Sequence, residues 1–181
     1  MARPAIAGRA TAHIVLKLVY FRSSSMKGPS MTSDQVVIAD DGPFLRATVR
    51  LPRCTADQAM EAFTVPERLR QWWGGELSTD LTAGGPYTIF FRGLGQTMAG
   101  RVVRYVPGRT LEVTWAWDHE RQPARRTVVI AADGSGPAIV TIEHGPHGVT
   151  EPEARARAEH RAGWEFFLPK LVALLAGPDA P

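Results

Sequence analysis

The sequence predicts an α+β domain in which a curved seven-stranded antiparallel sheet packs against one long C-terminal helix. After Gly75, polar and apolar residues alternate for about seventy residues, interrupted by turn signals such as "TAGG", "PGR" and "DGSG". Residues 152–176 then follow a helical pattern that starts at a proline and stops before Gly177. A sheet with one apolar face must be buried against another element, and this helix is long enough to cover it.

The first expected strand is "FLRATVRL", residues 44–51, because its side chains alternate between apolar and polar. Two short helices are expected after it. Thr55 is a suitable N-cap for the first, and Pro66 suits the first position of the second, "PERLRQWW". Six further strands follow: "ELSTDL", "GPYTIFFRG", "QTMAGRVVRYV", "TLEVTWAWD", "ARRTVVIAA" and "PAIVTIEHG". Their short links predict antiparallel pairing.

Charge and composition divide the chain into three parts. Residues 1–33 hold five arginines and lysines and no acid, whereas all 18 acidic residues come later, so the basic pI of about 9.4 reflects this N-terminal part. We expect residues 1–33 to be a flexible basic extension, residues 34–177 to be one domain, and residues 178–181 to be a tail. Without a basic domain, nucleic-acid binding loses its main support.

The expected location is the cytoplasm. The apolar run "AHIVLKLVYF" is similar to a signal peptide, but Lys17 interrupts it and no clear cleavage site follows. The preferred interpretation is an N-terminal extension that results from a start codon upstream of Met26 or Met31. Cys54 is the single cysteine, which excludes a disulfide framework, and no apolar run is long enough to cross a membrane.

Four segments carry a resemblance to a known family: "FTVPERLRQWWGG", "GGPYTIFF", "GRVVRYVPGRTLEVTWAW" and "HRAGWEFFLPKLVALL". Over residues 43–176 the chain resembles the activator of Hsp90 ATPase homologue 1-like branch of the START-like or Bet v 1-like superfamily (SRPBCC, helix-grip). This resemblance implies a sheet wrapped round the last helix, with a cavity between them for apolar or aromatic small molecules. Some relatives are polyketide cyclases, some confer self-resistance in antibiotic producers, and the co-chaperone relatives have a further domain.

Tryptophans are the leading candidates for contacts with such a ligand. Trp115 and Trp117 lie on one face of their strand, either as plain core or as a stacking wall for a planar ligand. Trp72 and Trp73 lie about 100° apart on a helix, so we expect one to anchor the helix in the core and the other to lie over the cavity mouth or on the surface. The expected ligand contacts are Trp72, Trp73, Tyr87, Phe91, Trp115, Trp117, His160, Trp164 and Leu168.

Few side chains suggest chemistry. His160 and Tyr87 are the weak candidates for proton transfer, and a capped or solvated histidine is the simpler interpretation of His160. His144 and His147 have no nearby cysteine and no third ligand at a usual spacing, so no metal site is predicted. Nucleotide-binding and hydrolase motifs are absent, and we expect no cofactor.

The terminal helix contains two residues that disfavour a straight helix. Pro169 removes a backbone donor, and Gly163 lowers helix stability by about 1 kcal/mol relative to alanine. We expect these two positions to bend the helix and to make room beside Trp164.

Three functions remain open from the sequence. The first is a monomeric or weakly dimeric protein that binds an aromatic or polycyclic small molecule, for example in natural-product biosynthesis or in self-resistance to an enediyne-type antibiotic. The second is a polyketide cyclase or aromatase. The third is a protein-interaction module of the co-chaperone kind.

Overall fold

A computed structural model describes residues 35–118, 120, 126–133 and 137–176 of the chain. The proposed extension, residues 1–33, and the proposed tail, residues 178–181, lie outside the described residues. The strands are β1 (Val36–Asp41), β2 (Phe44–Leu51), β3 (Glu76–Thr79), β4 (Pro86–Phe91), β5 (Gln96–Val106), β6 (Thr110–Trp117), β7 (Arg126–Asp133) and β8 (Ala138–Gly145). The helices are α2 (Ala56–Thr64), α3 (Pro66–Trp73) and α4 (Glu151–Leu175).

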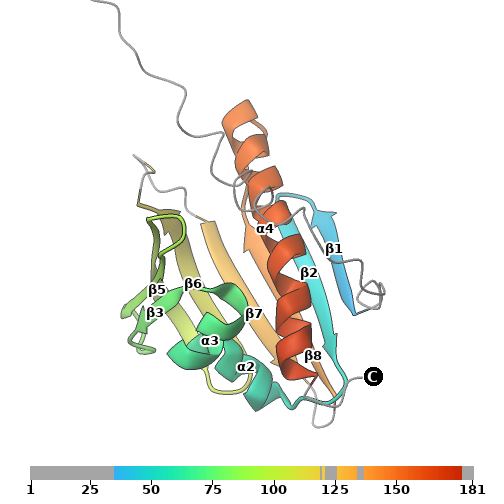
Figure 1. The fold of residues 1–181 in the computed structure, drawn as a ribbon. Coiled ribbons are helices and arrows are strands. Elements are labelled where there is room, and N and C mark those ends of the chain that lie inside the picture. The colour runs from blue at the N-terminus through green and yellow to red at the C-terminus, as the bar shows by residue number, and fades with distance from the viewer. Residues whose placement is uncertain (1–34, 119, 121–125, 134–136, 177–181) are drawn as a thin grey trace, which may run out of the picture.

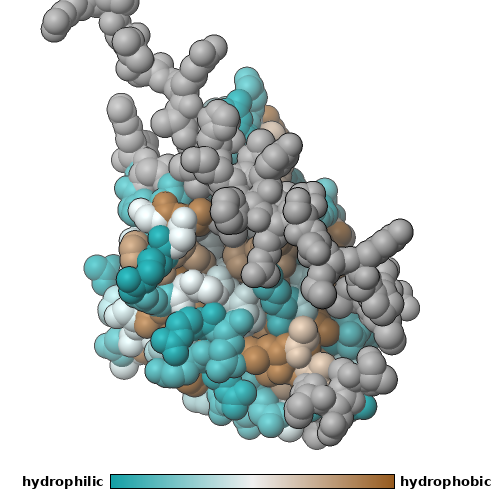
Figure 2. Space-filling view, viewed as in Figure 1, coloured by the Kyte–Doolittle hydropathy of each residue, from teal (hydrophilic) through white to brown (hydrophobic). Residues whose placement is uncertain are grey.

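The strands form one antiparallel sheet in the order β1-β2-β8-β7-β6-β5-β4-β3, and all three helices lie on the same side of it (Figure 1). Helix α4 packs against β1 and β2, α2 packs against β7 and β8, and α3 lies between β3 and α4. The predicted architecture, a curved sheet around a long terminal helix, is therefore confirmed. Many apolar side chains between the sheet and the helices are buried, and the coloured part of the face in Figure 2 is mainly hydrophilic, with smaller apolar patches.

The sequence-based strand count was one too low. The described part of the chain has eight strands because "VVIADD" forms β1 beside β2, so the two short helices follow the second strand and not the first. Contacts with α4 hold this edge strand in place. Arg157 and Arg161 each form an ion pair with Asp40, at 2.9 and 2.8 Å. The Arg161 hydrogen bond is the main reason that the pKa of Asp40 is lowered.

Local sequence signals explain the two short helices. Thr55 and Gln58 form a capping box at the start of α2, with the Thr55 side chain accepting from the Gln58 backbone N–H. Pro66 occupies the first turn of α3, and Gly74 ends this helix with a φ of 73°, a conformation that suits glycine. The next residue, Gly75, passes so close to β4 that a Cβ atom would collide with Ile89. Helix α3 is thereby held tightly against the sheet.

Helix α4 is polar in its first half and packed in its second half, as its sequence predicts. Its buried residues are Trp164, Leu168, Leu171 and Val172. Pro169 lies inside the helix, and a Cβ on Gly163 would have no atom within 4 Å apart from its chain neighbours and the nearby backbone of the helix. Gly163 therefore leaves open space immediately before the buried Trp164. No helix in the described part of the chain is long and apolar enough to cross a membrane.

Candidate functional site: an aromatic pocket with three histidines

A pocket of about 480 Å³ lies between the first half of α4, the end of α3 and the strands β4 and β6. Its wall is dominated by aromatic rings. Trp73, at the end of α3, stands at the centre of these contacts: its ring centroid is 5.8 Å from that of Trp115 and 5.2 Å from that of Trp164. Trp117 makes a T-shaped contact with Trp115, with ring centroids 5.9 Å apart. The pocket therefore offers flat apolar walls at several orientations.

Six of the nine expected ligand contacts line this pocket: Trp73, Phe91, Trp115, Trp117, His160 and Trp164. The other three lie elsewhere in the core. The indole N–H of Trp72 donates to the Ala62 carbonyl at 2.9 Å, and the hydroxyl of Tyr87 donates to the Phe63 carbonyl at 2.6 Å. Leu168 is fully buried. Trp72 and Tyr87 therefore hold the C-terminal end of α2 and do not border the pocket.

The adjacent tryptophans Trp72 and Trp73 are both buried, with exposed fractions of 1% and 5%. The alternative in which the second tryptophan lies on the surface is wrong, because α3 is covered on two sides, by the sheet and by α4. Their rings stack at 4.8 Å. Trp72 is the anchor in the core, and Trp73 is the one that reaches the pocket.

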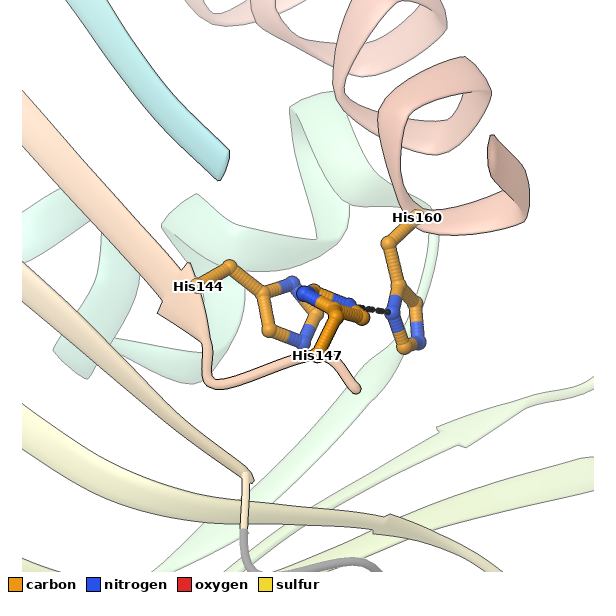
Figure 3. Close-up of side chains that lie close together, drawn as sticks. All are labelled: His144, His147 and His160. Carbon is orange, nitrogen blue, oxygen red and sulfur yellow. Dashed lines mark hydrogen bonds between the residues drawn. The ribbon is translucent and has the colours of Figure 1, made fainter. Parts of the chain in front are cut away.

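Three histidines lie close together (Figure 3), and two of them line the pocket. His144 comes from the end of β8, His147 from the loop after it, and His160 from α4. Their ring centroids are separated by 4.1 Å for His144 and His160 and by 5.3 Å for His147 and His160. The Nε2 atom of His147 and the Nδ1 atom of His160 share a hydrogen bond of 3.0 Å. His144 and His160 border the pocket, whereas His147 does not line it.

The hydrogen bond between Trp164 and His144 fixes the tautomer of His144. The indole N–H of Trp164 lies 3.2 Å from Nδ1 of His144, and an indole nitrogen can only donate. Nδ1 must therefore carry the lone pair, and the ring proton of neutral His144 is on Nε2. This Nε2–H is buried and has no hydrogen-bond partner in the described structure.

All three imidazoles are held neutral. Burial, followed by the nearby His160, His147 and Arg126, lowers the pKa of His144 well below its usual value. Burial, with contributions from His147 and Arg126, lowers the pKa of His160 to about 3. Burial and Arg126 also lower the pKa of His147. At pH 7 the cluster therefore carries no charge of its own.

Arg126, a buried positive charge that acts on all three histidines, is itself paired with acids. Arg126 is 2% exposed, and its guanidinium donates to Glu153 at 2.7 Å and to Glu120 at 3.2 Å. Glu120 also accepts the backbone N–H of Trp117 at 2.9 Å and lines the pocket. Arg126 therefore links Glu120, which lines the pocket, to Glu153, which lies in the first turn of α4.

The three histidines also have the spacing of possible metal ligands, since one ring nitrogen from each lies within 4.8 Å of the others. The sequence offers no third ligand at a usual spacing from His144 and His147, but folding brings His160 beside them. The chemistry of His144 argues against a metal, however. Its Nδ1 lone pair is used by Trp164, so a metal on Nε2 would require the ring to lose its last proton.

His144 lines the pocket although it is not among the expected ligand contacts. Its side chain lies on the inward face of β8 and has an exposed fraction of 1%. The sequence signal for this position is its spacing from Ile142: residues two apart on a strand point to the same face, and Ile142 is an apolar residue that faces the core. His147 and Arg126 gave no such signal, since their contacts come from distant parts of the chain.

Solved structures share this fold. DynU16, described as a protein in the dynemicin biosynthetic locus, is 26% identical, with a TM-score of 0.61; the match covers 75% of this chain and 48% of DynU16, so the chain spans about half of that protein. CalU16 from Micromonospora echinospora is 20% identical, with a TM-score of 0.61; the match covers 81% of this chain and 86% of CalU16. The Aha1 dimer from Colwellia psychrerythraea is 19% identical, with a TM-score of 0.59; the match covers 76% of this chain and 98% of the Aha1 chain. No curated protein matches the chain.

An antiparallel sheet curved around a terminal helix, with a pocket between them, defines the helix-grip class, and the chain has this fold. Residues 53–176 match the family described as activator of Hsp90 ATPase homolog 1-like protein. The chain belongs to this family, as its sequence segments predict. The family assignment establishes the fold and leaves the ligand to be argued from the pocket.

Proposed function

We propose that this protein binds a planar aromatic or polycyclic small molecule in the pocket between α4 and the sheet. The observation that carries the proposal is the lining itself. Four of the five tryptophans of the chain border one cavity of about 480 Å³. A cavity of this size is in the range of small-molecule sites, and aromatic walls give a planar ligand a large contact area.

A packed core is the alternative interpretation of the same rings. Trp73 and Trp164 are almost fully buried and contribute to the core in any case. Trp117 is only half-buried, and open space remains beside Gly163 on the opposite wall. Rings that served packing alone would be expected to fill this space, so the open volume favours a ligand.

The first experiment is a titration with a panel of probes: anthraquinone-2-sulfonate, naringenin, 8-anilinonaphthalene-1-sulfonate and oleate, followed by tryptophan fluorescence and by thermal shift. We expect saturable quenching by the planar aromatic probes. A probe present at 100 times its dissociation constant is expected to stabilise the fold by about 2.7 kcal/mol. A flat response to the whole panel would contradict the proposal.

Strand β4 offers a matched pair of variants for this titration. Phe91 lines the pocket, whereas Phe90, its neighbour, points to the opposite face and is 37% exposed. Phe91→Leu is expected to weaken probe binding several-fold, and Phe90→Leu is expected to leave it unchanged. Equal effects of the two substitutions would place the bound probe outside the pocket.

One observation favours a second function, cyclase-type catalysis. His160 borders the pocket and is hydrogen-bonded to His147, which is an arrangement suited to moving a proton. A pKa of about 3 makes His160 a weak base at neutral pH, so binding without turnover is the preferred proposal. Turnover of a poly-β-ketone substrate that His160→Gln abolishes while probe binding persists would establish the catalytic role.

A further inference from the structure

Two buried hydrogen-bond donors at the pocket wall have no partner. They are the indole Nε1–H of Trp115 and the imidazole Nε2–H of His144, and both side chains border the pocket. Buried polar groups in folded proteins are almost always paired with protein, water or ligand atoms. Two unpaired donors on adjacent side chains of one cavity therefore indicate that an acceptor binds there.

The donor character of both atoms follows from their surroundings. An indole nitrogen can only donate, so Trp115 offers a proton whatever the pH. The Nε2 atom of His144 carries the ring proton because Trp164 occupies Nδ1. The two rings are in contact, with centroids 5.2 Å apart, so the two donors belong to neighbouring side chains of one pocket wall.

The charges around this point select the kind of acceptor. His144 and His160 are neutral at pH 7, and Arg126, the buried cation beside them, is bound to Glu120 and Glu153. A carboxylate or phosphate would find no uncompensated positive charge here and would have to lose its hydration. A neutral carbonyl oxygen needs only hydrogen-bond donors.

We infer that His144 Nε2–H and Trp115 Nε1–H form a subsite that binds a neutral carbonyl oxygen of a planar aromatic ligand, so that the preferred ligands are aromatic ketones and quinones. This inference rests on the proposed function and names the ligand class of the same pocket. The aromatic walls hold the ring system, and the two donors fix its orientation.

The test compares two probes of the same shape and charge, anthraquinone-2-sulfonate and anthracene-2-sulfonate, by isothermal titration calorimetry with the full-length chain. They differ in the two carbonyl oxygens. We expect the quinone to bind about tenfold more tightly, since it pairs donors that the anthracene leaves unpaired. Equal affinities would overturn the subsite while leaving the aromatic pocket intact, and failure of both probes to bind would reject the subsite together with the aromatic ligand.

Two substitutions of His144 separate the donor from its structural role. The side-chain amide of asparagine can take the place of Nδ1 and accept from Trp164, but it is too short to replace Nε2. The amide of glutamine reaches the position of Nε2. His144→Asn is expected to abolish the preference for the quinone, whereas His144→Gln is expected to keep part of it. Retention of the full preference by His144→Asn would overturn the inference.

The tautomer is measured independently of any ligand. Long-range ¹H–¹⁵N correlation spectra distinguish a protonated from an unprotonated imidazole nitrogen. We expect the His144 ring to show its proton on Nε2 and, on addition of anthraquinone-2-sulfonate, to show a shifted Nε2–H signal. A proton on Nδ1 of His144 would contradict the inference, because Nε2 would then be an acceptor.

Discussion

The neutral histidine cluster predicts a steep loss of stability in mild acid. An unfolded histidine titrates near 6.5, whereas His160 in the folded protein titrates near 3. Between these two values the unfolded chain binds a proton that the folded chain does not, so the free energy of unfolding falls as the pH falls. Lowering the pH from 7 to 5 is expected to remove about 2 kcal/mol through His160 alone.

His144 and His147 act in the same direction, because burial lowers the pKa of both in the folded state. The charged groups near the cluster are Arg126, Arg157, Glu120 and Glu153. The pKa of Glu153 is below its ordinary value, because its hydrogen bonds with Gly148 and Arg126 outweigh the effect of burial. The loss between pH 7 and pH 5 is therefore assigned to the imidazoles.

The assay is urea denaturation of wild type and His160→Gln at pH 7, 6 and 5, followed by tryptophan fluorescence. We expect the pH-dependent loss in His160→Gln to be smaller than in wild type by about 2 kcal/mol or more, since removing His160 also relieves His144. Tyr87→Phe is the control, because it destabilises the fold without removing a histidine. The difference in the free energy of unfolding between wild type and Tyr87→Phe is therefore expected to be the same at each pH. A wild-type protein equally stable at pH 7 and pH 5 would refute the neutral cluster.

Three further predictions follow from single contacts. Tyr87→Phe leaves the Phe63 carbonyl without its buried donor and is expected to lower the free energy of unfolding by about 1–3 kcal/mol, measured at pH 7. Gly163→Ala is expected to stabilise α4 by about 1 kcal/mol and to weaken probe binding, because its methyl group occupies pocket space; higher stability with unchanged affinity would contradict the role assigned to Gly163. Zn²⁺ and Co²⁺ are expected to leave the melting temperature unchanged, since Trp164 occupies the lone pair of His144; a stoichiometric increase would refute the assigned tautomer.

Much of the fold could be predicted from local pattern, because alternation and helix caps are properties of neighbouring residues. The buried faces of β2 and β4, the capping of α2 at Thr55 and the division of α4 into a polar and a packed half all follow from the sequence. Strand β1 was missed because four of its six residues, including the last three, are exposed. Its place depends on pairing with β2 and on the ion pairs of Asp40 with α4, which are contacts between distant segments.

The candidate site could be predicted only in part. Strand parity correctly places Phe91, Trp115 and Tyr87 on inward-facing positions, but it does not say how far the pocket extends along a strand. At Tyr87 the space is filled by the end of α2, whose Phe63 carbonyl binds the hydroxyl. The histidine cluster depends on where α4 crosses the end of β8, and spacing along the chain carries no information about that crossing.

The central claim, that this pocket binds a planar aromatic ligand, is tested most directly by the indole N–H signals in a ¹H–¹⁵N spectrum during titration with anthraquinone-2-sulfonate. Trp73, Trp115, Trp117 and Trp164 line the pocket, whereas the indole N–H of Trp72 is bound to the Ala62 carbonyl. We expect saturable shifts for the four lining tryptophans and the smallest shift for Trp72. Signals that do not move, or that move without saturation, would contradict it.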